Sequence, residues 1–313
     1  MDHAKISVIM PVYNAQAYLA ESIQSFVDQN LKEADLICVD DGSTDSSPQI
    51  LDSFRQRDPR IRVFTQSNQG AGAARNLALA HAQGDYVTFL DSDDYYPNGE
   101  TLQALHALAE RHSTKVAGGS LLFLDQNDLS RAKLGSNDFG FDEESVISYH
   151  DLQQAYYYQR FIYSRKMLDE AGIAFPPYRR FQDVVFFVRA MLEAERIAVT
   201  DTPSYVYRKS NHHAELTDEQ INDMLLGYID VLGLAREHGL SRLGDFLATR
   251  LAKGGATQKM VEDSIARGNE AARRHYDEAL ALVDQTPPKS TPKQESPDLV
   301  HKVARKLRAL LGH

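Results

Sequence analysis

Short apolar segments alternate with amphipathic helical segments through about the first hundred residues, and this alternation constrains the fold more than any other feature. The segments at 6–10, 36–39, 61–64 and 86–90 are rich in β-branched and aromatic residues and predict strands. In the segments between them, apolar residues recur at helical spacing. We expect Asn14 to cap the first helix and Gly84 to end the third. This order predicts right-handed βαβ units, hence an α/β fold with a mostly parallel central sheet and helices on both faces.

Polar clusters follow three of these strands, at 11–14, 40–45 and 91–94. Ligands of parallel sheets gather where the carboxyl ends of the strands meet. The run Leu90-Asp91-Ser92-Asp93-Asp94 places three carboxylates at one strand end, which suits a divalent cation. Taken alone, such a run is more often a turn or a helix cap.

Composition excludes several classes of protein. The 313 residues carry a formal net charge of -10, which argues against nucleic-acid binding. The single Cys38 excludes an internal disulfide framework and lies in an apolar segment, so we expect a buried thiol. We identify no signal peptide and no apolar stretch long enough to span a bilayer, and we expect a cytoplasmic protein.

Two nucleotide motifs are absent. Gly70-Ala71-Gly72 resembles the start of a dinucleotide fingerprint, but Arg75 stands at the third glycine position and the motif follows the third strand. The phosphate-binding loop of NTPases is also missing. A nicotinamide or ATP enzyme is therefore not expected.

Five motifs follow one another along the first hundred residues: Val8-Ile9-Met10-Pro11-Val12-Tyr13-Asn14, Val39-Asp40-Asp41-Gly42-Ser43-Thr44-Asp45, Asn68-Gln69-Gly70 with Ala74-Arg75-Asn76, Gly84-Asp85-Tyr86, and Leu90-Asp91-Ser92-Asp93-Asp94. Together they resemble the family 2 glycosyltransferases, which are inverting enzymes of the GT-A fold that use nucleotide-diphosphate sugars. The resemblance covers about the first hundred residues in the family's order and spacing, and continues more weakly through 163–187 and 205–208.

The resemblance implies a nucleotide site. Pro11 and Tyr13 would line the base pocket, and Asp41 would accept a hydrogen bond from uracil N3–H. Arg75 would reach the diphosphate or the carboxylates, while Asp91 would contact the ribose or a metal-bound water. The alternatives are a turn and helix cap for Asp41 and a solvated helix charge for Arg75.

The resemblance also implies a cation. Asp93 would bind Mn²⁺ or Mg²⁺ directly. His212 is a candidate further ligand, although adjacent His residues in a polar loop are more often simply exposed.

The resemblance assigns the catalytic base to Asp183. The family usually has a Glu-Asp pair at this helix start, whereas this chain has Gln182-Asp183, so only Asp183 can act. The alternative is a carboxylate that interacts with the helix dipole. On the acceptor side, the resemblance implies Tyr163, Arg165, Phe181 and Gln182.

The C-terminal third predicts a division of the chain. A catalytic domain would span 1–215 and a helical extension 216–285, which packs on the catalytic domain or on a second copy. Residues 286–298 have the composition of a Pro-rich linker. Residues 299–313 form a basic amphipathic pattern, which fits an anionic membrane surface or, alternatively, docking on protein.

The resulting hypothesis is a metal-dependent transferase that moves one sugar from a UDP-sugar to a glycan or lipid-linked acceptor, at the inner face of the cell membrane. The chain contains no Trp, so the Gln-x-x-Arg-Trp signature of processive members is missing. The alternative is a nucleotide-binding accessory subunit without turnover. A nucleotidylyltransferase is not expected, because its Gly-rich loop near the N-terminus is absent.

Overall fold

The computed structural model describes residues 4–125, 128–134, 140–209, 215–252 and 256–284. Its strands are β1 (Ile6–Val12), β2 (Ala34–Asp40), β3 (Ile61–Thr65), β4 (Tyr86–Phe89), β5 (Val116–Asp125), β6 (Asp128–Leu134), β7 (Ser145–Ser148), β8 (Phe161–Ser164) and β9 (Arg196–Lys209). In the described part of the chain they form one sheet in the order β3-β2-β1-β4-β8-β5-β9-β7, with β6 beside β5.

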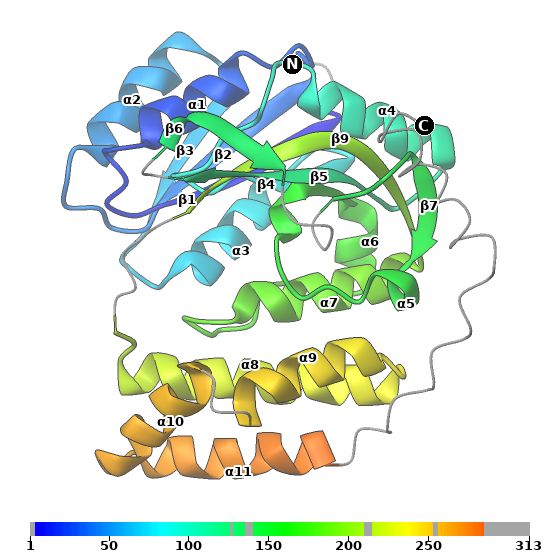
Figure 1. Ribbon diagram of the computed structural model, residues 1–313. Helices are drawn as coiled ribbons and strands as arrows, with labels where there is room; N and C mark the ends of the chain where they lie inside the picture. The colour runs from blue at the N-terminus through cyan, green and yellow to red at the C-terminus, as the bar shows by residue number, and fades with distance from the viewer. Residues whose placement is uncertain (1–3, 126–127, 135–139, 210–214, 253–255, 285–313) are drawn as a thin grey trace.

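Helices cover both faces of this sheet (Figure 1). They are α1 (Leu19–Val27), α2 (Ser47–Arg57), α3 (Ala71–His81), α4 (Thr101–His112), α5 (Tyr149–Leu152), α6 (Arg165–Glu170), α7 (Gln182–Ala194), α8 (Asp218–Glu237), α9 (Ser241–Ala252), α10 (Ala256–Ala266) and α11 (Glu270–Asp284), with a 3₁₀ turn η1 (Tyr158–Arg160). Helices α1, α2 and α4 lie on one face and α3, α6 and α7 on the other, with α8 to α11 as a further layer beyond α7.

The predicted α/β fold is confirmed. Strand β1 pairs in parallel with β2 and β4, and β2 pairs in parallel with β3. The later strands make the sheet mixed, because β8 runs antiparallel to both β4 and β5. The carboxyl ends of β1, β2 and β4 therefore meet at one edge, where the polar clusters lie.

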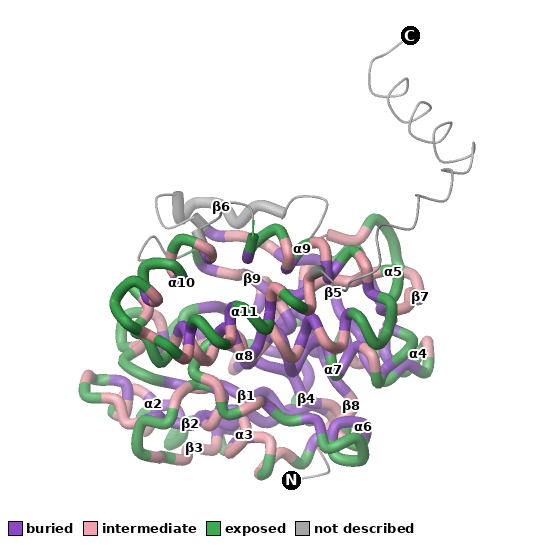
Figure 2. Tube along the Cα trace, turned by 90° about the horizontal axis from the view of Figure 1, so that it is seen from below, coloured by how far each residue is buried: buried purple, intermediate pink, exposed green. Residues whose placement is uncertain are grey.

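Side chains of β1 and β2 alternate between two hydrophobic cores. Ile9 and Ile37 join the core beneath α3 and α7, whereas Val8 and Leu36 join the core beneath α1, α2 and α4. In Figure 2 the central strands and α7 are largely buried, while exposed residues gather on outer helices such as α2 and α10. The buried sheet is a rigid support for the loops at its edge.

Two expected helix ends are wrong. Helix α1 begins at Leu19, and Asn14 lies before it with φ +49° and accepts a hydrogen bond from the Thr44 amide, Oδ1 to N 2.8 Å. Helix α3 ends before Gly84, so the end of the helix does not explain why this residue is a glycine. A Cβ on Gly84 would lie 2.5 Å from the Ser7 amide nitrogen of β1. Backbone proximity between strands therefore explains this glycine.

The predicted helical extension is confirmed. Thr217 and Gln220 form the expected capping box at the start of α8, with side chain to backbone distances of 3.3 Å and 3.0 Å. The apolar face of α8 packs on α7 and shares its core. None of the helices within the described ranges combines the length and hydropathy needed to cross a membrane. The predicted linker at 286–298 and the predicted amphipathic helix at 299–313 lie outside the described residues.

Candidate active site

A hollow of about 200 Å³ opens at the carboxyl ends of β1, β2 and β4. The sheet brings together residues that are up to 82 positions apart, from Pro11 to Asp93. The lining residues are Pro11, Val12, Tyr13, Asp41, Ala71, Arg75, Asp91, Ser92 and Asp93. The Tyr13 ring is 52% exposed, so one of its faces is free to receive a flat ligand.

The Asp41 carboxylate organises the loop between β3 and α3. Its oxygens accept hydrogen bonds from Gln66 Nε2, the Gln69 amide and the Gly70 amide, each at 2.8 Å. Gly70 allows this turn because its φ is +91°, a conformation that residues with a side chain rarely adopt. Asp41 is buried, and a carboxylate has about four acceptor positions. It is therefore both a loop anchor and an acceptor with capacity for one more donor.

Arg75 and Asp91 form the charged centre of the hollow. Arg75 Nη2 lies 2.7 Å from Asp91 Oδ1, and Gln159 Nε2 donates to Asp91 Oδ2 at 2.7 Å. Burial alone would lower the pKa of Arg75, but Tyr158, Asp91 and Asp183 outweigh it and raise that pKa. The Arg75 Nε atom is buried without a hydrogen-bond partner among the described residues. Arg75 is thus a fixed cation with unused donor capacity.

Asp93 and Asp94 are neighbours with opposite environments. The Asp93 side chain is exposed at the rim, and no described residue donates a hydrogen bond to its carboxylate. Partial desolvation by the surrounding protein, and then the Asp91 charge, raise its pKa. Asp94 is buried and structural: it accepts from Tyr205 Oη at 2.8 Å and from the Arg208 amide at 2.7 Å. Of the two, Asp93 is the carboxylate available to a ligand.

Asp183 lies in the first turn of α7, half-buried at the edge of this centre. Burial raises its pKa, and the Asp91 charge raises it further. The Arg75 guanidinium and the backbone amides at the helix start act in the other direction and favour the anion. The structure therefore brings Asp183 within electrostatic reach of both Arg75 and Asp91. A carboxylate whose pKa is raised is a better proton acceptor than an ordinary aspartate.

The two residues before Asp183 hold the start of α7 in place. Phe181 has the left-handed conformation, φ +68°, which is unfavourable for a residue with a side chain. Its ring is held by α8, where it stacks on Tyr228. Gln182 is buried and packs against Gly72 of α3, where an added Cβ would lie 3.1 Å from Gln182 Cγ. Both side chains therefore face protein.

The expected acceptor residues Tyr163 and Arg165 are not at the site. Tyr163 is fully buried in the core, and its hydroxyl donates to the Tyr158 carbonyl at 2.7 Å. Strand β8 runs antiparallel to β4, so Arg165 lies at the amino end of β4, where its Nε donates to the Gly84 carbonyl at 2.8 Å. These two expectations are wrong because the strand direction carries both residues away from the hollow.

The expected metal ligands are only partly placed. Asp91 and Asp93 lie in the hollow, whereas His212 lies outside the described residues. Within the described ranges, no three His, Cys, Asp or Glu side chains converge as a metal cluster. A magnesium-type site needs only one or two carboxylates when substrate phosphates and waters complete it. The free carboxylate of Asp93 beside Asp91 fits that arrangement.

Three contributors were not predicted from the sequence. Gln159 fixes Asp91, the Tyr205 hydroxyl accepts a hydrogen bond from the Asp91 amide at 3.1 Å, and Arg208 Nε donates to the Asp93 carbonyl at 2.9 Å. The similarity of 205–208 to the family was a signal for the last two. No pattern indicated Gln159, because it meets Asp91 only through the pairing of β8 with β4.

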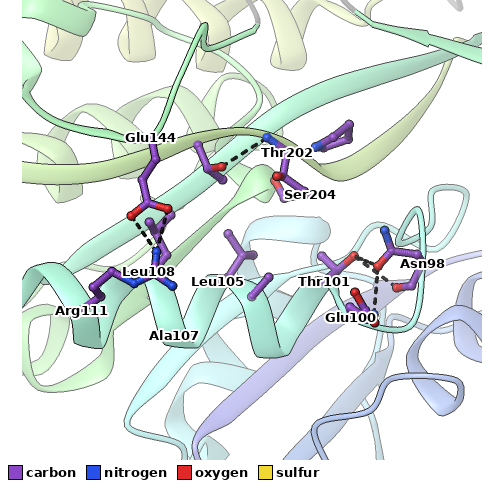
Figure 3. A pocket seen from close by; sticks show the side chains of 13 residues that line it. Asn98, Glu100, Thr101, Leu105, Ala107, Leu108, Arg111, Glu144, Thr202 and Ser204 are labelled. Carbon is purple, nitrogen blue, oxygen red and sulfur yellow. Dashed lines mark hydrogen bonds and ion pairs between the residues drawn. The ribbon is translucent and has the colours of Figure 1, made fainter.

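A second hollow, of about 190 Å³, lies between α4 and the bend of β9 (Figure 3). Two of its charged residues pair with each other, since Arg111 Nη1 lies 2.6 Å from Glu144 Oε1. Asn98 at the other end bonds to the Glu100 amide at 2.9 Å. The hollow at the edge of the sheet, which gathers Asp41, Arg75, Asp91 and Asp93, is the better candidate for chemistry.

The chain matches the model of the family described as "Glycosyl transferase family 2" over residues 7–172. An uncharacterized glycosyltransferase of Haemophilus influenzae is 44% identical over 119 residues, 38% of this chain and 48% of that protein. The uncharacterized glycosyltransferase EpsJ of Bacillus subtilis is 32% identical over 213 residues, 66% of this chain and 61% of that protein. The chain thus aligns with about half to three fifths of the length of these relatives.

Among solved structures, S. aureus TarS 1-349 in complex with UDP-GlcNAc is similar, with a TM-score of 0.66 and 25% identity over 90% of each chain. The similarity extends well beyond the residues that the family model matches, so the arrangement of sheet and helical extension is shared.

Proposed function

Because the chain belongs to glycosyltransferase family 2, we propose that it is an inverting, non-processive enzyme that transfers one sugar from a UDP-sugar to a glycan or lipid-linked acceptor in cell-surface polysaccharide synthesis. The observation that carries this proposal is the position of Asp183, a half-buried carboxylate with a raised pKa within reach of Arg75 and Asp91. A base beside a fixed cation is what an inverting displacement requires.

The nucleotide is proposed to occupy the hollow. The exposed ring of Tyr13 offers a stacking surface for the base, a contact typically worth ~1–3 kcal/mol. Asp41 has an acceptor position left for the uracil N3–H, while Pro11 shapes the same wall. The Arg75 guanidinium lines the hollow and places a positive charge beside the diphosphate, and Asp91 lines the same hollow, where it can reach the ribose. The TarS complex, which holds UDP-GlcNAc, supports this class of donor.

A divalent cation, Mn²⁺ or Mg²⁺, fits beside Asp93. Desolvation and the Asp91 charge raise the pKa of Asp93 and outweigh the opposing effect of Arg208 and Arg75, and a bound cation would stabilise the Asp93 anion. Asp91 is engaged by Arg75 and Gln159, so it is suited to contact through a water. When bound, the cation neutralises charge that develops on the leaving diphosphate.

The chemistry assigned to this chain's residues is a proton transfer at Asp183. The Asp183 carboxylate takes the proton of the attacking hydroxyl as the new bond to the anomeric carbon forms and the bond to UDP breaks. Arg75 lowers the pKa of Asp183 and so favours its ionised form, and it supports the negative charge of the nucleotide. The Tyr158 and Phe175 rings, 5.5 Å and 5.4 Å from the Arg75 guanidinium, keep water from it.

The variant Asp183→Asn tests the proposal. We expect it to bind UDP in the presence of Mn²⁺ within about threefold of the unmodified protein, because its amide keeps the shape of the site. Transfer, and the slow hydrolysis of the UDP-sugar, should fall at least 10²-fold, within the usual range for a lost general base. Asp169→Asn, at an exposed carboxylate on α6, is the matched control. Full activity of Asp183→Asn would remove the base assignment.

The same experiment distinguishes the proposed enzyme from the alternative, an accessory subunit without turnover. A nucleotide-binding subunit without turnover would bind UDP but leave a panel of UDP-sugars unhydrolysed in both forms of the protein. Residues 299–313, whose sequence is basic and amphipathic, support a place at the inner face of the cell membrane. This location fits a lipid-linked acceptor.

A further inference from the structure

A groove of about 510 Å³ lies between the segment around α5 and helix α9. The lining residues are Gly140, Phe141, Ile147, Asp151, Leu152, Gln153, Gln154, Ala155, Tyr156, Arg242 and Phe246. Its walls are fixed to each other, because Gln153 Oε1 accepts hydrogen bonds from the amides of Arg242 and Leu243 at 2.9 Å and 3.2 Å. The groove is therefore preformed, as ligand sites usually are.

Two aromatic rings and one cation form a platform in this groove. The Phe246 ring is 40% exposed, and Tyr13 at the nucleotide hollow is the only other large hydrophobic side chain counted as exposed in the described ranges. The Phe246 and Tyr156 centroids are 5.7 Å apart with planes at 75°. The Arg250 guanidinium lies 5.6 Å from each ring centroid. An exposed ring inside a hollow is suited to stack on a ligand rather than to pack in a core.

The inner end of the groove reaches the start of α7. The Tyr156 ring lies 6.4 Å from that of Phe181, two residues before Asp183. Burial raises the pKa of Tyr156, and the Asp183 charge contributes to the same shift. Asp183 is thus an electrostatic neighbour of the groove through Tyr156, and of the nucleotide hollow through Arg75 and Asp91. A base between two hollows can serve a donor in one and an acceptor in the other.

We propose that this groove binds a saccharide unit of the acceptor, with a sugar face against Phe246, the edge of that sugar against Tyr156, and the attacking hydroxyl directed towards Asp183. An aromatic face suits the C–H face of a sugar ring, and the mixture of apolar side chains with polar ones, which include Asp151 and Arg242, suits a ligand that has both apolar and hydroxyl surfaces. This inference rests on the proposed function. It replaces Tyr163 and Arg165, which the fold places elsewhere, as the acceptor side.

The bond changes balance with the reaction proposed above. The acceptor oxygen forms a bond to the anomeric carbon, and the bond between that carbon and the β-phosphate oxygen breaks. UDP leaves with the electron pair, and the acceptor's proton goes to the Asp183 carboxylate. No oxidant or further reactant is required.

The test uses the full chain with UDP and Mn²⁺ and measures saturation-transfer NMR on methyl glycosides of glucose, galactose, mannose, N-acetylglucosamine and N-acetylgalactosamine. At least one glycoside should receive saturation, and Phe246→Ala should reduce that signal at least fivefold. Phe246→Tyr, which keeps a ring, should retain it. Thr249→Ala is the matched control, since Thr249 is exposed on the same helix but does not line the groove.

Each outcome of this test either supports or overturns the groove assignment. The groove assignment is overturned if no glycoside binds, if Phe246→Ala binds as well as the unmodified chain, or if an octyl chain binds there in place of the methyl glycosides. In each case, UDP binding on the same samples and the Asp183→Asn result would leave the proposed function intact. Failure of UDP to bind would instead contradict the proposed function.

Discussion

The ring of Phe181 stacks on the ring of Tyr228, with centroids 4.4 Å apart and planes inclined by 20°. Tyr228 belongs to α8, in the helical extension, whereas Phe181 immediately precedes the helix that carries Asp183. The contact stabilises a left-handed backbone at Phe181 that costs of order 1–3 kcal/mol when unsupported. The helical extension therefore fixes the position of the candidate base.

Gly227→Ala should impair this positioning. A Cβ at Gly227 would lie 2.9 Å from Phe181 Cδ1 and 3.0 Å from Phe181 Cβ, so the ring has to move. Displacement of a catalytic group by about 1 Å can cost about 10²-fold in rate, and we expect a 10- to 100-fold fall in kcat. The dissociation constant for UDP should stay within about twofold. Steady-state kinetics and UDP titration calorimetry measure the two quantities.

Gly233→Ala is the control on the same helix, because a Cβ there meets nothing within 4 Å. Alanine is the better helix former by up to about 1 kcal/mol, so this variant should be at least as stable and fully active. Equal kcat values for both variants would show that α8 does not position Asp183.

The pH dependence of kcat should respond in opposite directions to two substitutions. Arg75 lowers the pKa of Asp183 and Asp91 raises it. Arg75→Gln should therefore move the acid limb of the kcat profile to higher pH, and Asp91→Asn should move it to lower pH, because the base acts only when ionised. Profiles that shift together, or not at all, would mean that another group controls the limb. Asp91→Asn keeps an acceptor for Arg75 at Oδ1, and the unpartnered Oε1 of Gln159 can accept from the new amide after rotation.

Asp93→Asn should uncouple UDP binding from the cation. For the unmodified chain we expect Mn²⁺ to tighten UDP binding, and for Asp93→Asn we expect Mn²⁺ to have no more than a twofold effect. Because the pKa of Asp93 is raised, its charge is unfavourable in the folded state, so the variant should not lower the free energy of unfolding. Calorimetric titration of UDP with and without Mn²⁺ makes the measurement. An undiminished effect of Mn²⁺ in Asp93→Asn would place the cation elsewhere.

The sequence of residues 299–313 predicts salt-dependent binding to anionic vesicles. Its basic residues each contribute on the order of 1 kcal/mol near such a surface. The full chain should sediment with vesicles that contain phosphatidylglycerol and not with pure phosphatidylcholine. A chain that ends at residue 298 should lose this binding but keep its affinity for UDP. Retained binding by the shortened chain would assign the membrane contact to another surface.

The location of the candidate site at the edge of the sheet could be predicted, because the carboxyl ends of neighbouring parallel strands lie side by side. Once the strands before Asp41 and Asp91 are recognised, their carboxyl ends have to meet, and the structure places both residues in one hollow. The reversed direction of β8 could not be read from local pattern. Tyr163 and Arg165 were therefore assigned to a surface that they do not reach.

Contacts between residues that lie far apart in the sequence also could not be predicted. Gln159 meets Asp91 across 68 positions, and Tyr205 meets Asp94 across 111. Neither pair has a spacing that periodicity could indicate, since both depend on which strands lie side by side. Asn14 looked like a helix cap because its side chain suits that role, but it caps the turn at Thr44 across the strand ends instead.

A crystal structure of the full chain soaked with UDP and MnCl₂ tests the central claim most directly. The account predicts the uracil ring on Tyr13, the diphosphate beside Arg75, and Mn²⁺ within about 2.0–2.6 Å of an Asp93 oxygen, the usual range for cations bound by carboxylates. Density for UDP at another place, or Mn²⁺ bound away from Asp93, would contradict it.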